Sequence, residues 1–414
     1  MKLRGVFQSI AAFLIAVALA GCGGGGGGGG VVTPPSPVIH TRAEAQGGAQ
    51  WTVLVYLDAD NDLESAGINN FNQMEMVGST RDVHVIVQMD RMSGTDPDND
   101  SWTDTRRYLI IQDSDPKRMQ SIRLDDPPLG ELDMGSPLTL RNFVAWGVNE
   151  FPADHYLLVI WDHGSGWQIR STSMQLEYKY VADDDTSGTQ INVTDIPGAL
   201  AGLNVDVVAF DACYMQQLEV AYELRGSARY LVGSAAVEPS PGYNYARLLS
   251  HIASGTDPEQ LCRMIVAQYG MEYPEPSGNI TQSAIDLQRI GDVATAASTF
   301  ARVLESNAGS ANLAAARSDS LNYSSSGSNP NSRDLLDYAY KCADVIGPTA
   351  NAAYTDLANA VSAAVIASTH NADMPNAHGL AVYVPPPRSY DSRYGRLSLA
   401  RDTDWDDWLQ AQKQ

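Results

Sequence analysis

Two short strings of residues stand at the ends of apolar segments and could act together in nucleophilic catalysis. His163 follows the apolar run at 156–161, and Cys213 follows the run at 205–210. Short continuous apolar runs are typical of buried parallel strands, whose carboxyl ends lie at the edge of an open sheet where α/β proteins place their chemistry. We therefore expect both residues at one edge. A free thiol, with a pKa near about 8.5, needs a neighbouring imidazole to become a thiolate at neutral pH, so this pair predicts a cysteine hydrolase.

The expected strands belong to an alternating pattern of strands and helices. A helix predicted at 63–77 separates the first two strands, and another at 138–149 precedes the strand of His163. Strand-helix-strand units with long crossovers imply a mainly parallel sheet with helices on both faces. The predicted fold class is therefore α/β, with a mainly parallel central sheet flanked by helices. The strands of the core are expected at 51–58, 84–89, 105–112, 156–161, 205–210 and 230–235.

The amino terminus carries a targeting signal. Lys2 and Arg4 form a basic start, and residues 6–18 are an apolar stretch too short to span a membrane. The following Leu-Ala-Gly-Cys string, which ends at Cys22, resembles the lipobox of bacterial lipoproteins. In such proteins the cysteine is acylated and becomes the mature amino terminus, so the resemblance implies an exported cell-envelope lipoprotein. The alternative is an ordinary cleaved signal peptide in which the cysteine has no role.

Composition divides the rest of the chain. Residues 23–30 are an unbroken glycine run, which behaves as a flexible coil. After about residue 250 the pattern is helix-rich, with one late strand at 379–384. We predict a signal peptide at 1–21, a tether at 22–50, a catalytic core at 51–250 and a helix-rich part at 251–414 that contributes a late strand. Helices of this last part are expected at 259–269, 293–304, 333–345 and 352–368.

The charge and the cysteine content exclude several classes of function. The 414 residues carry a formal net charge of −22, which disfavours binding to nucleic acid and favours cationic substrates. The four cysteines are too few and too scattered for a disulfide framework or a zinc cluster. No later apolar run is long enough for a membrane span.

The catalytic strings occur in a wider pattern. His163-Gly164 after one strand and Asp211-Ala212-Cys213 after the next resemble the clostripain family of cysteine peptidases, relatives of caspases, gingipains and separase. Further matches stand at 51–56, 60–64 and 379–385. The resemblance implies a caspase-like fold and an endopeptidase that works through a thioester. It makes Cys213 the nucleophile and His163 the general base and acid, with the backbone amides of Gly164 and Cys213 as the oxyanion hole.

The resemblance also indicates where a substrate side chain would bind. Asp211 matches the family's acid near the base of the pocket for the residue before the cleaved bond, which favours arginine or lysine there. The alternative role for Asp211 is to cap the helix after Cys213. Where the family often has a second acid, this chain has Asn244, which keeps the hydrogen bonding and loses the charge. Glu238 could compensate for that loss.

Two further properties are expected from relatives. Family members are often activated by self-cleavage between the histidine and cysteine strands, where Arg170 and Lys179 are candidate sites. Some relatives respond to calcium, so the acidic string at 58–62 suggests calcium stimulation. A strand end followed by a helix cap explains the same string, and the acids at 96–100 and 183–185 are expected in solvated loops. We therefore assign no metal site and no required cofactor.

A competing function uses the same fold. A catalytically silent, caspase-like binding lipoprotein would share the signal and the sheet, although the presence of both His163 and Cys213 argues against it. The expected partners are a peptide or protein substrate and, through the lipid anchor, a membrane. No nucleic acid partner is expected, and the chain is expected to act as a monomer.

Overall fold

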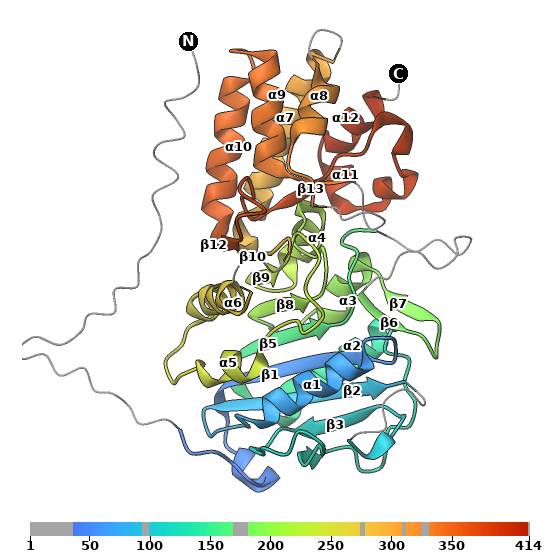
Figure 1. Ribbon diagram of the computed structural model, residues 1–414, viewed down its shortest axis with the longest axis vertical. Coiled ribbons are helices and arrows are strands. Elements are labelled where there is room, and N and C mark those ends of the chain that lie inside the picture. Colours follow the sequence, from blue (N-terminus) through green and yellow to red (C-terminus); the bar gives the residue numbers. More distant parts are fainter. Residues whose placement is uncertain are drawn as a thin grey trace, which may run out of the picture. The chain divides into compact units, whose positions relative to one another are not determined.

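Parallel strands form the centre of a nine-stranded sheet in the computed structural model (Figure 1). The structure describes residues 36–92, 99–168, 181–273, 278–308, 312–323 and 331–412. Among these residues the sheet has the order β12-β10-β9-β8-β5-β1-β2-β3-β4. The parallel strands are β1 (Ala49–Ala59), β2 (Val83–Arg91), β5 (Ala153–Trp161), β8 (Val207–Asp211) and β9 (Tyr230–Gly233). This arrangement confirms the predicted fold class.

Antiparallel strands extend the sheet on both sides of this parallel centre. β10 (Thr281–Asp286) and β12 (Val365–His370) follow β9, whereas β3 (Arg106–Leu109) and β4 (Ile122–Arg123) follow β2. Two small two-stranded sheets lie outside the large one. They pair β6 (Val181–Asp184) with β7 (Thr189–Ile191), and β11 (Ser332–Asp334) with β13 (Ala381–Tyr383).

Helices cover both faces of the sheet because the parallel strands are apolar on both faces. In β1, Val53 and Val55 pack into one core cluster, and Leu54 and Tyr56 pack into the other. The first cluster includes residues of α1 (Glu64–Glu75), α5 (Tyr245–Ser250) and α6 (Pro258–Glu272). The second includes residues of α2 (Pro137–Glu150), α3 (Ile196–Leu200), α4 (Leu218–Glu223), α7 (Ile290–Ser306), α8 (Leu313–Asp319), α9 (Leu335–Ile346), α10 (Asn351–Ala364), α11 (Ser398–Asp402) and α12 (Trp405–Ala411).

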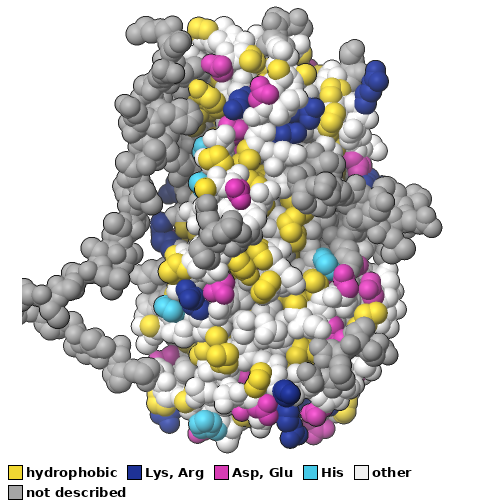
Figure 2. All heavy atoms as spheres, in the orientation of Figure 1, with side chains coloured by type: hydrophobic (Ala, Val, Ile, Leu, Met, Phe, Trp, Pro, Cys, Tyr) yellow, Lys and Arg dark blue, Asp and Glu magenta, His cyan; other side chains and the backbone are white. Residues whose placement is uncertain are grey.

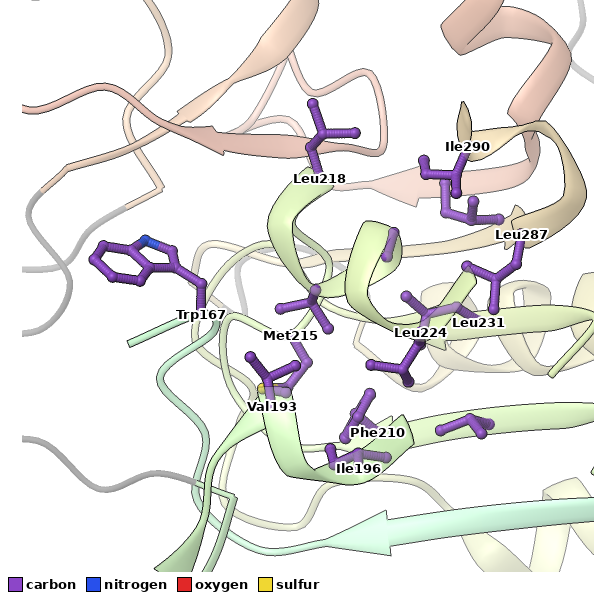
Figure 3. Close-up of a cluster of buried hydrophobic side chains, with 14 of the residues drawn as sticks. Trp167, Val193, Ile196, Phe210, Met215, Leu218, Leu224, Leu231, Leu287 and Ile290 are labelled. Carbon is purple, nitrogen blue, oxygen red and sulfur yellow. The ribbon is translucent and has the colours of Figure 1, made fainter. Parts of the chain in front are cut away.

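The second core cluster fixes the segment that follows the nucleophile candidate. Figure 3 shows Met215, two residues after Cys213, near Phe210 of β8, while Leu218 at the start of α4 and Leu231 of β9 lie elsewhere in the same cluster. All four side chains are fully buried. Because close-packed interiors resist small displacements, this packing holds the turn after β8 in one position.

Basic and acidic side chains lie together on the surface. On the face shown in Figure 2, Lys and Arg side chains occur in small separate groups with acidic side chains nearby. Among the described residues visible there, they form no continuous basic tract. Among the described residues, no helix is both long and apolar enough to cross a bilayer.

The folded unit differs from the predicted division in two respects. It begins at Ser36, so residues 36–50, which we assigned to the tether, belong to it. Ile39 and Ala45 of this segment are buried in the core. The predicted boundary at 250 separates no units either, because β10 and β12 from the later part are hydrogen-bonded into the same sheet as β1.

The structure corrects one prediction for the carboxyl-terminal part and confirms another. The helix expected at 352–368 ends at Ala364, and residues from Val365 onward form β12. The late strand expected at 379–384 is confirmed as β13, which pairs with β11 in a separate two-stranded sheet. The central sheet thus receives β10 and β12, neither of which was predicted as a strand.

Candidate active site

The register of β5 and β8 brings His163 and Cys213 to the same edge of the sheet. Trp161 pairs with Asp211, and each candidate residue stands two positions beyond this pair. Both candidate residues line one open pocket of about 590 Å³. The pocket is lined by Leu63, Trp161, Asp162, His163, Asp211, Ala212, Cys213, Val237, Glu238, Pro239, Ser240 and Gly242.

The Cys213 thiol is half-buried and is held by the loop after β9. The backbone N–H of Glu238 donates to Sγ of Cys213 at 3.2 Å. Burial raises the pKa of the Cys213 thiol, and the nearby charges of Asp211 and Asp162 act in the same direction. Thiolate formation at neutral pH therefore requires a positive group, which a protonated His163 at the same pocket can supply.

The backbone turns sharply directly after the nucleophile candidate. Tyr214 has a φ of 63°, in the left-handed region that side chains rarely adopt. Its backbone N–H donates to the carbonyl of Ala236 at 3.0 Å. Strained backbone of this kind persists where surrounding structure fixes it, and here it presents Cys213 at the rim of the pocket.

Gly164 lies against the backbone of Cys213. A Cβ atom at position 164 would lie 2.3 Å from the carbonyl oxygen of Cys213 and 2.9 Å from its backbone nitrogen. Only glycine permits this close approach. The loop of His163 and the loop of Cys213 are thus in direct backbone contact, which is the proximity that two amides of one oxyanion hole require.

Asp211 is buried beside the pocket, where hydrogen bonds hold its carboxylate. It accepts from the backbone N–H of Tyr243 at 3.1 and 3.2 Å and from the hydroxyl of Tyr245 at 2.9 Å. Gly242, with a φ of 62°, passes so close that a Cβ there would lie 2.4 Å from an Asp211 oxygen. Burial raises the pKa of Asp211 to about 6. The hydrogen bonds to the carboxylate favour its charged form and oppose part of this rise.

The alternative role of Asp211 as a helix cap is wrong. The next helix, α4, begins at Leu218 and has Gln217 at its N-cap position. Asp211 stands at the end of β8, and its carboxylate contacts the segment 243–245 instead. Asp211 therefore lines the pocket of Cys213 and caps no helix among the described residues.

Glu238 adds a second carboxyl group to the pocket. Its side chain is buried beside Asp211 and Gln282, and neither carboxyl oxygen has a hydrogen bond of normal geometry among the described residues. Burial, together with the negative charge of Asp211, raises the pKa of Glu238 well above its ordinary value. A buried carboxyl without a partner is costly, so this side chain is poised to receive a hydrogen-bond donor or a cation from a ligand.

The imidazole of His163 has an acidic partner that the sequence analysis did not assign. Nε2 of His163 lies 2.9 Å from Oδ1 of Asp62, in the loop between β1 and α1. The sequence holds one signal for this pair, because Asp62 follows the strand that neighbours β5 in the sheet. Apart from this signal, the two residues cannot be paired from the sequence, because 101 positions separate them along the chain.

Comparison with known proteins identifies the family. The family model described as the clostripain family matches residues 55–410. The chain belongs to the clostripain family. Clostripain of Hathewaya histolytica is 30% identical over 229 residues, which cover 49% of this chain. This chain spans less than half, 42%, of the length of that relative.

Solved structures share the fold of this clostripain-family chain. A secreted C11 cysteine protease of Bacteroides thetaiotaomicron, iotapain, has a TM-score of 0.66 at 17% identity and covers 86% of this chain and 99% of its own. An inactive zymogen C11 protease of Parabacteroides distasonis has a TM-score of 0.64 at 20% identity, with coverage of 86% and 99%. A secreted C11 cysteine protease of Bacteroides thetaiotaomicron in complex with an irreversible peptide inhibitor also has a TM-score of 0.64, at 20% identity, with coverage of 87% and 100%.

The structure places Asn244, the residue where clostripain relatives often carry a second acid, outside this pocket. Its side chain caps α5 by accepting from the backbone N–H of Arg247 and donates to Glu272 at 3.0 Å. It lines a separate pocket together with Tyr243 and Tyr269. Arg170, Lys179 and Cys22 lie outside the described residues. Their predicted roles in processing and lipidation stay predictions.

An acidic cluster that could hold a cation lies behind the histidine loop. One carboxylate oxygen each from Asp60, Glu131 and Asp184 lies within 4.8 Å of the others. Asp60 is buried, and its Oδ1 has no hydrogen-bond partner among the described residues. The predicted solvated loop at 183–185 is wrong for Asp183 and Asp184, because both are buried in β6. Oxygen donors of this kind suit Ca²⁺.

Proposed function

We propose that the chain is a cysteine endopeptidase. The observation that carries this proposal is that His163 and Cys213 line the same pocket. Beside this pocket the backbone of Gly164 contacts the backbone of Cys213. This arrangement supplies a nucleophile, a base and two backbone amides, which are the groups that acyl transfer requires.

The proposed reaction has two steps. Sγ of Cys213 bonds to the carbonyl carbon of the substrate while His163 takes the thiol proton, and the amides of Gly164 and Cys213 stabilise the resulting oxyanion. The C–N bond then breaks, His163 gives its proton to the leaving amine, and a thioester remains. In the second step His163 deprotonates a water molecule, which adds to the thioester. The C–S bond breaks, the acid product leaves, and the thiol is restored.

We further propose that the pocket prefers arginine or lysine before the cleaved bond. The preference is supported by two buried carboxyl groups, Asp211 and Glu238, that line the pocket of Cys213. A cationic side chain placed between them would supply the hydrogen-bond donors that Glu238 lacks. A neutral side chain would leave Glu238 without a partner. Glu238 would then provide the second acid that Asn244 does not.

The variant Glu238→Gln tests the preference with little disturbance of the fold, because no protein donor binds this carboxyl among the described residues. A guanidinium bound beside Glu238 would favour its charged form. We therefore expect kcat/KM for an arginine substrate to fall about 10- to 100-fold relative to a matched neutral substrate, since a hydrogen bond to a charged group contributes about 1.5–3 kcal/mol. The same ratio in the unaltered chain should fall as the pH drops below about 6, where Asp211 takes up a proton. The ratio of the two kcat/KM values is used because protonation of Cys213 lowers both values equally and so cancels.

Glu272→Gln is the matched control, because this acid contacts Asn244 and lies outside the pocket of Cys213. It should leave the arginine preference unchanged. A preference for neutral side chains in the unaltered chain would contradict the basic-side-chain proposal.

The silent binding lipoprotein is less well supported. A binding protein has no need for a buried thiol, an imidazole and a close glycine contact at one pocket, all of which this chain has.

We also propose that the chain is exported and lipid-anchored at Cys22. The support for this is the signal-like string at residues 1–22. Mass spectrometry of the amino terminus of the native protein would reveal a diacylated or triacylated Cys22.

Finally, we propose that Asp60, Glu131 and Asp184 bind a divalent cation such as Ca²⁺. The proposal rests on their convergence and on the buried, unpartnered oxygen of Asp60. The cluster is linked to the catalytic loop, because Asn61 donates both to Asp162 at 2.8 Å and to the carbonyl of Asp183 at 3.0 Å. A bound cation would therefore stabilise the segments behind His163.

Thermal unfolding with Ca²⁺ or with a chelator tests the cation site. We expect Ca²⁺ to raise the unfolding midpoint by several degrees, since ligand at about 100 times its Kd contributes about 2.7 kcal/mol. Glu131→Gln should reduce this rise, whereas Glu305→Gln, a change at another exposed acid, should not. Equal midpoints in Ca²⁺ and chelator would contradict the proposal.

A further inference from the structure

The partner of the His163 ring is an acid from a different part of the sheet. Oδ1 of Asp62 lies 2.9 Å from Nε2 of His163. We propose that Asp62 is a positioning residue, which fixes the ring of His163 so that Nδ1 is the nitrogen that exchanges a proton with Cys213. This inference rests on the proposed peptidase function. It adds a third member to what the sequence analysis treated as a Cys-His pair.

The loop that carries Asp62 is anchored on both sides of this residue. Asn61 is fully buried, and its amide donates to Asp162 at 2.8 Å and to the carbonyl of Asp183 at 3.0 Å. Its side-chain oxygen accepts from the backbone N–H of Leu63 at 2.9 Å. Leu63 in turn lines the pocket. Asp62 is therefore held between an anchored residue and a pocket residue, opposite His163.

The chemistry of the pair determines which ring nitrogen is available. A carboxylate only accepts hydrogen bonds, so Nε2 must carry the hydrogen in the contact with Asp62. In the neutral ring the lone pair is then on Nδ1. The proton of the Cys213 thiol would move to Nδ1 and from there to the leaving amine. Asp62 exchanges no proton, and its negative charge stabilises the imidazolium that forms between these transfers.

The exposure of Asp62 sets the size of the effect. Its side chain is 70% exposed, against 24% for His163, so water screens the charge and the fold does not depend on it. We expect its contribution to come mainly from fixing the orientation and tautomer of the ring. Carboxylates that orient a metal-bound histidine contribute on the order of 10- to 100-fold in metal affinity or activity, and we expect an effect of the same order from Asp62.

Kinetics of the full chain with an arginine peptide test the inference. Asp62→Ala should lower kcat about 10- to 100-fold and leave KM within about twofold, because the interaction acts on the chemical step. Asp62→Glu should recover a large part of kcat, because it restores the carboxylate. The control Asp407→Ala changes an exposed acid of α12 and should have no effect. An unchanged kcat in Asp62→Ala, or a change in KM alone, overturns the inference.

A spectroscopic measurement separates this inference from the proposed function. In the Cys213→Ala chain labelled with ¹⁵N-histidine, we expect the chemical shifts of His163 to show the hydrogen on Nε2, and this tautomer to lose population when Asp62 is also replaced by alanine. This readout needs no turnover, so it tests Asp62 even if the chain hydrolyses nothing. Shifts of His163 that do not respond to the loss of Asp62 overturn the inference.

Discussion

Replacing Cys213 by alanine should abolish peptide-bond hydrolysis, with kcat falling by more than about 10⁴-fold. Without Sγ no thioester can form, and the remaining amides and pocket can provide only binding and partial oxyanion stabilisation. His163→Ala should cause a loss of similar order, because burial raises the pKa of the Cys213 thiol and leaves it protonated without a neighbouring imidazolium. The double variant should be little worse than either single one, since the two residues act as a unit. Steady-state kinetics with an arginine peptide measures all three.

Cys262→Ala provides the control for this experiment. Cys262 is a fully buried free thiol on α6, and burial raises its pKa well above the ordinary value. Its replacement should leave kcat unchanged. Hydrolysis that survives in Cys213→Ala and disappears in Cys262→Ala would place the chemistry elsewhere.

Replacing Gly164 by alanine should lower kcat by about 10²–10³-fold or more, the size expected when one oxyanion donor is lost. The new Cβ would lie 2.3 Å from the carbonyl oxygen of Cys213, a distance that no contact between these atoms tolerates. The two nearest neighbours of this Cβ are backbone atoms, and the third is Cβ of Ala212 at 3.1 Å, so the conflict can be relieved only if the histidine loop and the nucleophile loop move apart. We expect the unfolding midpoint to fall as well, because overpacking typically costs about 1–3 kcal/mol.

Gly291→Ala is a matched control for this second prediction. Gly291 lies in α7, and a Cβ there meets no atom within 4 Å. Alanine in a helix is favoured over glycine, so this variant should unfold no earlier than the unaltered chain and should keep its activity. If Gly164→Ala retains full kcat, the contact between the two loops does not matter for catalysis.

The sequence predicted the centre of the fold well and its edges poorly. The parallel strands are continuous apolar runs, so their pattern is unambiguous. β10 escaped prediction because its sequence, Thr-Gln-Ser-Ala-Ile-Asp, is mostly polar although every residue is buried. β12 escaped because it is an edge strand whose residues are half-buried or exposed, and it follows α10 without a break. At such positions hydrogen bonding within the sheet decides the structure, and hydrophobic periodicity does not reveal it.

The candidate site shows the same division. The positions of His163 and Cys213 at one edge of the sheet were predictable because each residue follows an apolar strand. The roles of Gly164 and Asp211 came from the resemblance to the family. Asp62 and the acidic cluster were not, because their partners are distant in sequence. Glu131 stands in a loop before α2, and no periodic pattern places it beside Asp60. Only the folded arrangement brings these carboxylates together.

The most direct test of a His163-activated Cys213 is covalent labelling of the full chain with a thiol-reactive acyl probe that carries arginine. Mass spectrometry should find one adduct, on Cys213, and the adduct should disappear in Cys213→Ala and be strongly reduced in His163→Ala. A probe with a neutral side chain should label more slowly, since it leaves Glu238 without a partner. Labelling of Cys213 at the same rate with and without His163 would contradict the account, because the thiol would then react without its base.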